Sequence, residues 1–249
     1  MRAYFLCSLA LASVMALAGA PSVELIPTTI TVPAGESAGS VAIRNTSNAA
    51  VGFRASALSW TNAGEQDVRL EPTDDLVVFP ATLVIPPKDT RKIRIGARFG
   101  PVAIERSYRL ILEEVAVEPS ASSAGVVMRM RFSLPLFFQP KDRRTSVELA
   151  APDLSSGRVR VTVRNAGRLH VTPRAFTIVG LDAAGAEIWS RTLPAWYLLA
   201  GESRTYDRDL TLDECGPTAS VTVDIRFLED NVAVLRKEHR VGLRACDRP

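Results

Sequence analysis

The sequence has 249 residues, of which 47% are hydrophobic and 23% charged, and its formal net charge is +3. This length suits one large domain or two of ordinary size, and the composition argues against global disorder. A net charge this small gives no electrostatic indication of a nucleic-acid or membrane-surface partner, so we expect neither.

The first 18 residues have the features of a secretory signal peptide. Arg2 supplies a positive charge, residues 3–17 are almost wholly apolar, and Ala16-Leu17-Ala18 offers small residues at a cleavage site. We expect cleavage after Ala18. Because no later stretch is long and apolar enough to span a bilayer, we expect a soluble mature protein with no membrane insertion.

Two cysteines remain after the signal peptide, which contains Cys7. Cys215 and Cys246 form an even pair in an exported protein, so we expect a disulfide between them in an oxidising compartment. The sequence has only two histidines, His170 and His239, with no ligand spacing between them. We therefore predict no metal site.

Short alternating runs dominate the chain and helical periodicity is almost absent, which predicts an all-β fold. In the first half we expect strands at residues 40–44, 51–60, 82–85, 92–97, 108–117 and 126–138. Turn residues are expected at 61–64, and small residues form a loop at 119–125. This spacing of strands and turns predicts an immunoglobulin-like sandwich.

The pattern of strands then starts again after a polar, proline-containing linker. We expect further strands at residues 146–150, 158–164, 174–181, 187–193, 204–210, 220–228 and 232–243. This repetition favours a second sandwich. The predicted organisation is a signal peptide (1–18), a first domain (19–140), a linker (141–144) and a second domain (145–249).

One string matches a catalytic motif. Gly35-Glu36-Ser37-Ala38-Gly39 fits the G-x-S-x-G nucleophile elbow of α/β-hydrolases, in which a strand-to-helix turn exposes the serine. Here residues 41–44 alternate like a strand, and fewer than twenty mature residues precede the motif. We interpret it as a turn between two strands, and we predict no catalytic residue and no cofactor.

The segment at residues 126–138 is the strongest functional candidate. Its first half follows a loop of small residues, and an exposed apolar edge there is an aggregation liability unless a partner covers it. Residues 134–138 are expected to be a core strand. Alternation places these side chains on one face: Val126, Met128, Met130, Phe132, Leu134, Leu136 and Phe138.

Several segments, in their order along the chain, resemble the PapD-like periplasmic chaperones that assemble pili or fimbriae. They are Pro33-Ala34-Gly35 before residues 41–45, Val78-Phe79-Pro80 before residues 91–95, Ser107-Tyr108-Arg109-Leu110, residues 134–140 and residues 227–231. Residues 71–75 and Ile95-Gly96 look most like the archaic branch of chaperone–usher systems. The resemblance spans nearly the whole mature chain.

This resemblance implies two immunoglobulin-like sandwiches in an L-shaped arrangement, located in the periplasm. Such a chaperone binds a pilus subunit whose own sandwich lacks a strand, donates its G strand, and delivers the subunit to an outer-membrane usher without catalysing a reaction. A self-dimer is one way for the free protein to protect its edge, and the sequence does not decide whether it forms. The implied donor residues here are Val126, Met128, Met130 and Phe132.

The usual anchor for the subunit's C-terminal carboxylate is missing. Typical members use an Arg on the first strand and a Lys on the G strand, and the matching positions here are Thr28 or Thr29, and Pro135. Arg129 and Arg131 share the face of Pro135 and are the candidates for a replacement.

The resemblance also implies an ion pair between Arg94 and Asp230 that fixes the angle between the domains. Two rival functions stay open beside the chaperone. One is a structural or binding module, either a pilus subunit or an extracellular carbohydrate-binding sandwich. In the carbohydrate-binding alternative, Trp189, Trp196 and Tyr197 would form an aromatic platform. The other is the hydrolase suggested by the G-x-S-x-G string.

Overall fold

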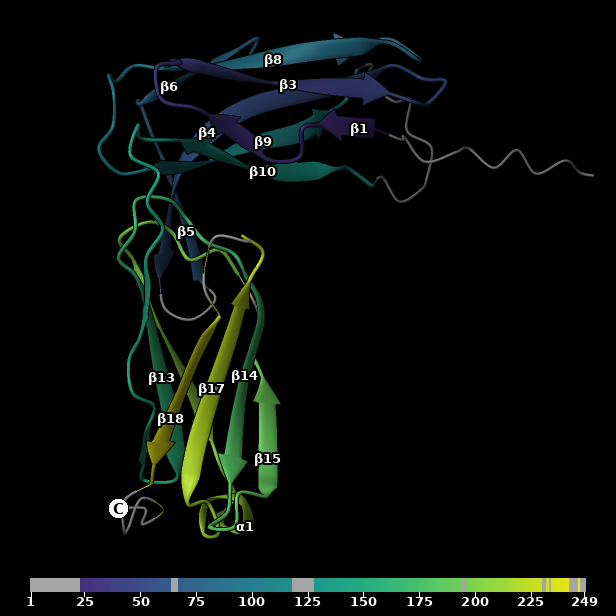
Figure 1. Ribbon diagram of the computed structural model, residues 1–249. Helices are drawn as coiled ribbons and strands as arrows, with labels where there is room; N and C mark the ends of the chain where they lie inside the picture. The colour runs from purple at the N-terminus through teal and green to yellow at the C-terminus, as the bar shows by residue number, and fades with distance from the viewer. Residues whose placement is uncertain are drawn as a thin grey trace, which may run out of the picture.

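The computed structural model describes residues 23–63, 67–117, 128–193, 196–229, 232, 234–241 and 246. These described residues form four β-sheets, two in the first half of the chain and two in the second. Figure 1 shows two bodies, with the strands of the first running across one end of the second, so that together they form an L. The predicted signal peptide lies outside the described residues.

The first body is a sandwich of two sheets, ordered β1-β3-β8-β6 and β2-β10-β9-β4-β5, with β7 also paired to β4. Its strands are β1 (Val23–Ile26), β2 (Ile30–Val32), β3 (Ala38–Asn45), β4 (Val51–Ala63), β5 (Asp67–Pro72), β6 (Leu76–Phe79), β7 (Thr82–Ile85), β8 (Thr90–Ala97), β9 (Arg106–Val115) and β10 (Arg131–Phe138).

The core of this sandwich follows from strand alternation. Val41 and Ile43 of β3, and Ile93 and Ile95 of β8, are completely buried, while the residues between them in each strand lie toward solvent. The all-β prediction is therefore confirmed for this half.

Two expected boundaries in the first body are wrong. The turn predicted at 61–64 begins too early, because β4 continues to Ala63 and pairs with β5, a strand that was not predicted. The strand predicted from residue 126 starts later: β10 begins at Arg131, and residues 128–130 precede it without strand structure. Local alternation could not show either end, because the partner strands and the second body determine them.

The second body is also a sandwich, with one sheet built around β13 and the other ordered β15-β14-β17-β18. Phe176, Trp189 and Tyr206 lie in its core. Its elements are β11 (Val147–Leu149), β12 (Asp153–Ser155), β13 (Arg158–Asn165), β14 (Pro173–Leu181), β15 (Glu187–Thr192), β16 (Ser203–Asp209), α1 (Leu212–Cys215), β17 (Ser220–Phe227) and β18 (Leu235–Arg240).

The short helix α1 begins with a capping box, in which Thr211 and Glu214 exchange side-chain and backbone hydrogen bonds. These bonds hold the Glu214 carboxylate in its charged form and lower its pKa. Of the helices that the structure describes, none is long and apolar enough to cross a membrane.

A disulfide joins Cys215, at the end of α1, to Cys246, with 5.7 Å between the Cα atoms. It closes the chain across a sequence separation of 31 residues and ties β18 and the C-terminal part of the chain to the second core.

Replacing both cysteines with serine should lower the free energy of unfolding of the second body. A loop of this length restricts the unfolded chain by about 3–4 kcal/mol on the chain-entropy account. Urea unfolding followed by tryptophan fluorescence measures the difference, and a reducing agent should destabilise the wild type but not the Cys215→Ser/Cys246→Ser variant. Equal midpoints for both proteins under oxidising conditions would contradict the prediction.

Candidate strand-donation site

The strand β10 has one open side. Along its whole length it pairs with β9, but on its other side β2 covers only Leu136–Phe138. Within the described chain, no strand pairs with that side of residues 131–135. An exposed edge of this kind presents backbone groups to which another polypeptide can add a strand.

Burial along this segment changes from one end to the other. Leu134 and Leu136 are buried, which confirms the expectation that this half is a core strand. Met130 and Phe132 are partly buried against the first core, and Met128 is 86% exposed. Val126, the fourth predicted donor residue, lies outside the described residues. The apolar face thus becomes progressively more open toward the N-terminal end of β10.

The two predicted anchor residues lie at the open end of the segment. Arg131 makes a cross-strand ion pair with Glu113, with 3.0 Å between Nε and Oε1, and both side chains are about half exposed. Arg129 is exposed. Arg131 thus already has an anionic partner in this chain.

A third arginine, which sequence reasoning missed, lies directly beside Pro135. Arg109 of β9 is the cross-strand partner of Pro135 and is only 6% exposed. Its guanidinium carbon lies 3.7 Å from the centre of the Trp60 ring, and Nη1 donates to the Ser133 carbonyl at 3.3 Å. Nε has no hydrogen-bond partner among the described residues. Burial lowers the pKa of Arg109, although an arginine remains charged in proteins.

A second buried arginine faces the same region from the other body. Arg204 of β16 is 2% exposed, and its Nη2 donates to the Tyr197 carbonyl at 3.0 Å. Its Nε and Nη1 have no partner within the described chain. The Tyr197 ring lies 5.7 Å from the guanidinium of Arg109, so both arginines lie near Tyr197. Buried cations with unused donors favour an anionic ligand.

The two bodies meet at a buried carboxylate. The Glu105 side chain has no exposed surface, and its Oε1 accepts from the His170 backbone N–H at 2.8 Å and lies 2.7 Å from His170 Nδ1. Gln139 Nε2 donates to the other oxygen at 3.3 Å. The His170 ring stacks on Phe137 of β10, with 3.8 Å between the ring centres. The joint between the bodies therefore contacts the candidate donor strand itself.

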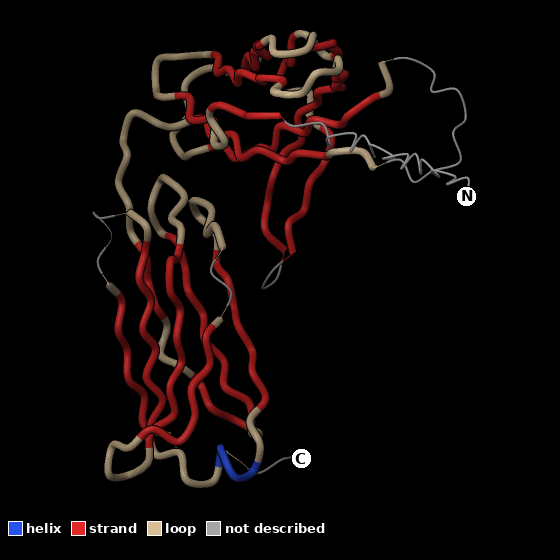
Figure 2. The backbone as a smooth tube through the Cα atoms, turned by 90° about the vertical axis from the view of Figure 1, so that its right-hand side faces the viewer, coloured by secondary structure: helices blue, strands red, loops and turns tan. Residues whose placement is uncertain are grey.

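The β4–β5 hairpin makes a further contact between the bodies. The backbone N–H and side-chain Nδ2 of Asn62 donate to the Glu202 carboxylate at 3.1 and 2.7 Å. Burial raises the pKa of Glu202, against the opposing effect of these hydrogen bonds. Figures 1 and 2 show the hairpin extending out of the first body toward the second. Beside it, Trp60 and Phe137 pack against Leu199 of the second body.

The ion pair predicted between Arg94 and Asp230 stays a prediction. Arg94 is exposed on β8, and Asp230 lies outside the described residues. The contacts that the structure does show between the bodies include those of Glu105 and Phe137 with His170, and that of the hairpin with Glu202. No pattern in the sequence connects these segments.

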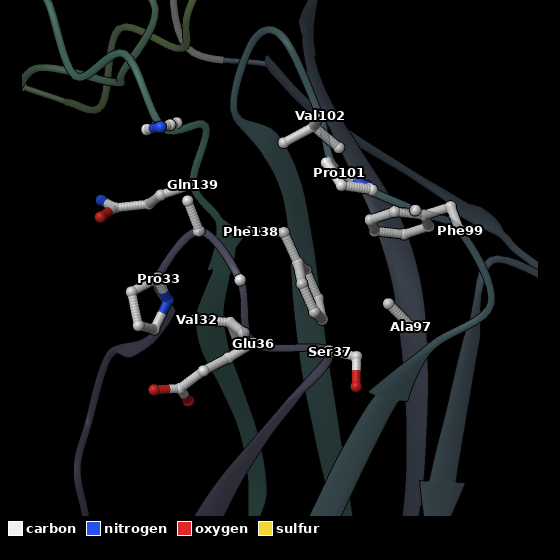
Figure 3. Close-up of a pocket in the computed structure, with 14 residues that line it drawn as sticks. Val32, Pro33, Glu36, Ser37, Ala97, Phe99, Pro101, Val102, Phe138 and Gln139 are labelled. Atoms are coloured by element: carbon white, nitrogen blue, oxygen red, sulfur yellow. The ribbon is translucent and has the colours of Figure 1, made fainter.

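The G-x-S-x-G string forms a turn beside a cavity of about 470 Å³. Gly35 adopts a left-handed conformation with φ +93°, and the chain continues directly into β3. Figure 3 shows Glu36 and Ser37 at this cavity with the rings of Phe99 and Phe138. None of the described residues that line it is a histidine, so Ser37 has no imidazole base there.

The three aromatic residues of the rival sugar-binding hypothesis do not form a shared platform. Trp189 is buried in the second core and donates from Nε1 to Thr218. Trp196 and Tyr197 meet edge to face at 86°, and Tyr197 packs into the joint between the bodies. The platform expectation is wrong because the indole of Trp189 completes the core.

Comparison with known proteins relates the chain to pilus assembly. Residues 22–143 match the family model described as "Pili and flagellar-assembly chaperone, PapD N-terminal domain". A comparison with curated protein sequences gives no match.

Several solved structures share the fold over most of the chain. One is the CsuC–CsuE chaperone–tip adhesion subunit pre-assembly complex from archaic chaperone-usher Csu pili of Acinetobacter baumannii, with TM-score 0.60, 16% identity, and 88% of this chain and 98% of that chain covered. Another is the class 5 fimbriae chaperone CfaA, with TM-score 0.58, 14% identity, and coverage of 89% and 100%. A third is the Salmonella enterica SafA pilin in complex with the SafB chaperone, with TM-score 0.54, 14% identity, and coverage of 87% and 95%.

Proposed function

The chain belongs to the family of pili and flagellar-assembly chaperones, and from this premise we propose that it binds pilus subunits by adding the edge of β10 to their sheets. The observation that carries the proposal is the open side of β10 beside an apolar face that emerges from the core. Backbone hydrogen bonds from such an edge supply affinity, and alternate side chains fill the groove of the partner.

The donor side chains in this proposal are those of Val126, Met128, Met130 and Phe132. Burying each one in a subunit groove contributes about 1.5–3 kcal/mol before the cost of ordering the segment. Methionine suits this task because its unbranched side chain adapts to several related grooves. The reaction is binding and release, with no catalytic step and no cofactor.

Arg109 is our replacement for the missing carboxylate anchor. It lies opposite Pro135, the position where the family resemblance places a lysine, and it is buried with an unused Nε–H. Arg131 is a weaker candidate because Glu113 already neutralises it in the free protein. Arg204 adds a second positive charge, which is bonded to the Tyr197 carbonyl. A C-terminal carboxylate of a subunit would pair with these groups.

Arg109→Met should weaken subunit binding by about 10- to 150-fold, the worth of a hydrogen bond to a charged group. Methionine keeps an apolar stem against Trp60 but removes the charge and its donors. The free energy of unfolding of the free chaperone should be unchanged or higher, because the substitution removes a buried charge that has no counter-ion. Binding is measured by titrating the purified chaperone variants with a subunit.

The control for Arg109→Met is a subunit whose C-terminal carboxylate is amidated. The amidated subunit should bind the wild type as weakly as the free-acid subunit binds Arg109→Met, and the two changes together should cost no more than either alone. Additive losses would show that Arg109 acts on something other than the carboxylate.

Membership of this family also supports a periplasmic location and two further partners, an usher and a second copy of the chain. We place the mature protein in the periplasm after cleavage at Ala18, with an outer-membrane usher as the acceptor of the loaded subunit. In the absence of subunit, two copies would cover each other's β10 edges as a self-dimer, because an open apolar edge favours pairing.

Co-purification from the periplasm tests the proposed function. The tagged protein, co-expressed with a candidate pilus operon, should retain small pilin-like subunits that mass spectrometry identifies. If no operon yields a retained subunit while the protein itself is exported and folded, the chaperone function is wrong and carbohydrate binding becomes the next experiment.

A further inference from the structure

The backbone groups on the open side of β10 belong to the odd-numbered residues. On the β9 side, the Met130 carbonyl accepts from the Glu114 N–H at 2.9 Å, and the Met130 N–H donates to the Glu114 carboxylate at 2.9 Å. On the β2 side, the Gln139 N–H donates to the Val32 carbonyl at 2.9 Å. Strand alternation between these two points directs the backbone groups of Arg131, Ser133 and residue 135 away from β9.

This open side ends abruptly at position 135. Proline has no N–H, so Pro135 offers no donor where alternation would place the third one. Two residues earlier on the same side, the Ser133 carbonyl already accepts a hydrogen bond from Arg109 Nη1 at 3.3 Å. Beyond Pro135, β2 occupies the edge at Leu136–Phe138. Three different features therefore close the edge at the same place.

We propose that Pro135 limits the length of the strand that β10 can accept, so that backbone pairing with a bound subunit stops at Ser133. This inference rests on the proposed function and adds the residue that sets where pairing ends. The partner it fits is an extended polypeptide that pairs with Arg131 and Ser133 and then turns away or ends. Proline at position 135 does not weaken the pairing of β10 with β9, because the backbone nitrogen of residue 135 points away from β9.

The variant that tests the inference is Pro135→Val. Valine suits a strand and restores an outward N–H at position 135 without changing the pairs between β10 and β9. The chaperone–subunit complex isolated from the periplasm is the probe. We expect its dissociation to slow by about 2- to 12-fold, the effect of one added backbone hydrogen bond, and the new amide at position 135 to become protected from hydrogen exchange in the complex.

Ser133→Pro is the matched variant two residues earlier on the same side. It also leaves the bonds to β9 in place, so it should fold like the wild type, as its urea midpoint will verify. It removes an outward donor, and we expect dissociation to speed up by a similar factor. Leu134→Pro, which removes a bond to β9, should instead destabilise the free protein.

The outcomes separate this inference from the proposed function. If the wild-type complex forms and Pro135→Val leaves both the dissociation rate and the exchange at position 135 unchanged, Pro135 does not limit pairing. If Ser133→Pro is folded and also without effect, the outward groups of β10 do not bind the subunit, and the proposed strand addition itself is wrong.

Discussion

Replacing Met128 by arginine should weaken subunit binding by at least ~100-fold while leaving the stability of the free chaperone unchanged. Met128 is 86% exposed, so the free protein gains or loses little by the change. In the complex, the substitution removes about 1.5–3 kcal/mol of apolar burial and places a charged group in an apolar groove, which adds a further penalty. The sum exceeds two orders of magnitude in affinity.

Leu212→Arg is the matched control for Met128→Arg. Leu212 is 70% exposed on α1, which Figure 1 shows at the end of the second body far from β10. Leu212→Arg introduces the same charge at the position of another exposed apolar residue. Both variants should unfold at the wild-type urea concentration, and only Met128→Arg should lose the subunit in titration calorimetry. Full binding by Met128→Arg would exclude Met128 from the donor segment.

Replacing His170 by alanine should lower the free energy of unfolding by about 2–4 kcal/mol. The change removes the imidazole whose Nδ1 lies 2.7 Å from the fully buried Glu105 Oε1, and it leaves the backbone N–H of residue 170 and Gln139 Nε2 as the remaining partners of that carboxyl group. It also removes the ring that stacks on Phe137. Because these contacts hold the two bodies together, small-angle X-ray scattering should show a wider range of interdomain arrangements.

Glu105→Gln supplies the second half of a double-mutant cycle with His170→Ala. Once the charge at position 105 is gone, the loss of the imidazole should cost much less, so the double variant should be more stable than the sum of the two single changes predicts. Urea unfolding measures all four proteins. If His170→Ala shifts the unfolding free energy by less than about 0.5 kcal/mol, the Glu105–His170 contact does not support the joint.

Alternation in the sequence predicted most strands because one face of each strand is buried. Residues 158–164 and 220–228, for example, correspond closely to β13 and β17, where every second side chain enters the second core. By contrast, β5 was missed. Its run Asp67–Pro72 is largely polar, and β5 is held in place by pairing with β4. The hairpin of these two strands is hydrogen-bonded through Asn62 to Glu202, which is far away in sequence.

The candidate site was predictable only in part. The apolar alternation of residues 126–138 indicated a donor segment, but the sequence could not show that β2 covers its last three positions. Arg109 is a charged residue within the otherwise uncharged buried run of β9, and this was a visible signal for a functional cation. Its significance depends on Trp60 and Tyr197, which come from distant segments and enclose the guanidinium.

Residue-resolved hydrogen exchange of the chaperone with and without a bound subunit tests strand addition most directly. The account predicts strong protection of the Arg131 and Ser133 amides on binding, because these N–H groups face the open side of β10. It predicts no new protection at β18, an edge strand of the second body. Protection confined to the second body, with Arg131 and Ser133 exchanging as in the free protein, would contradict the central claim.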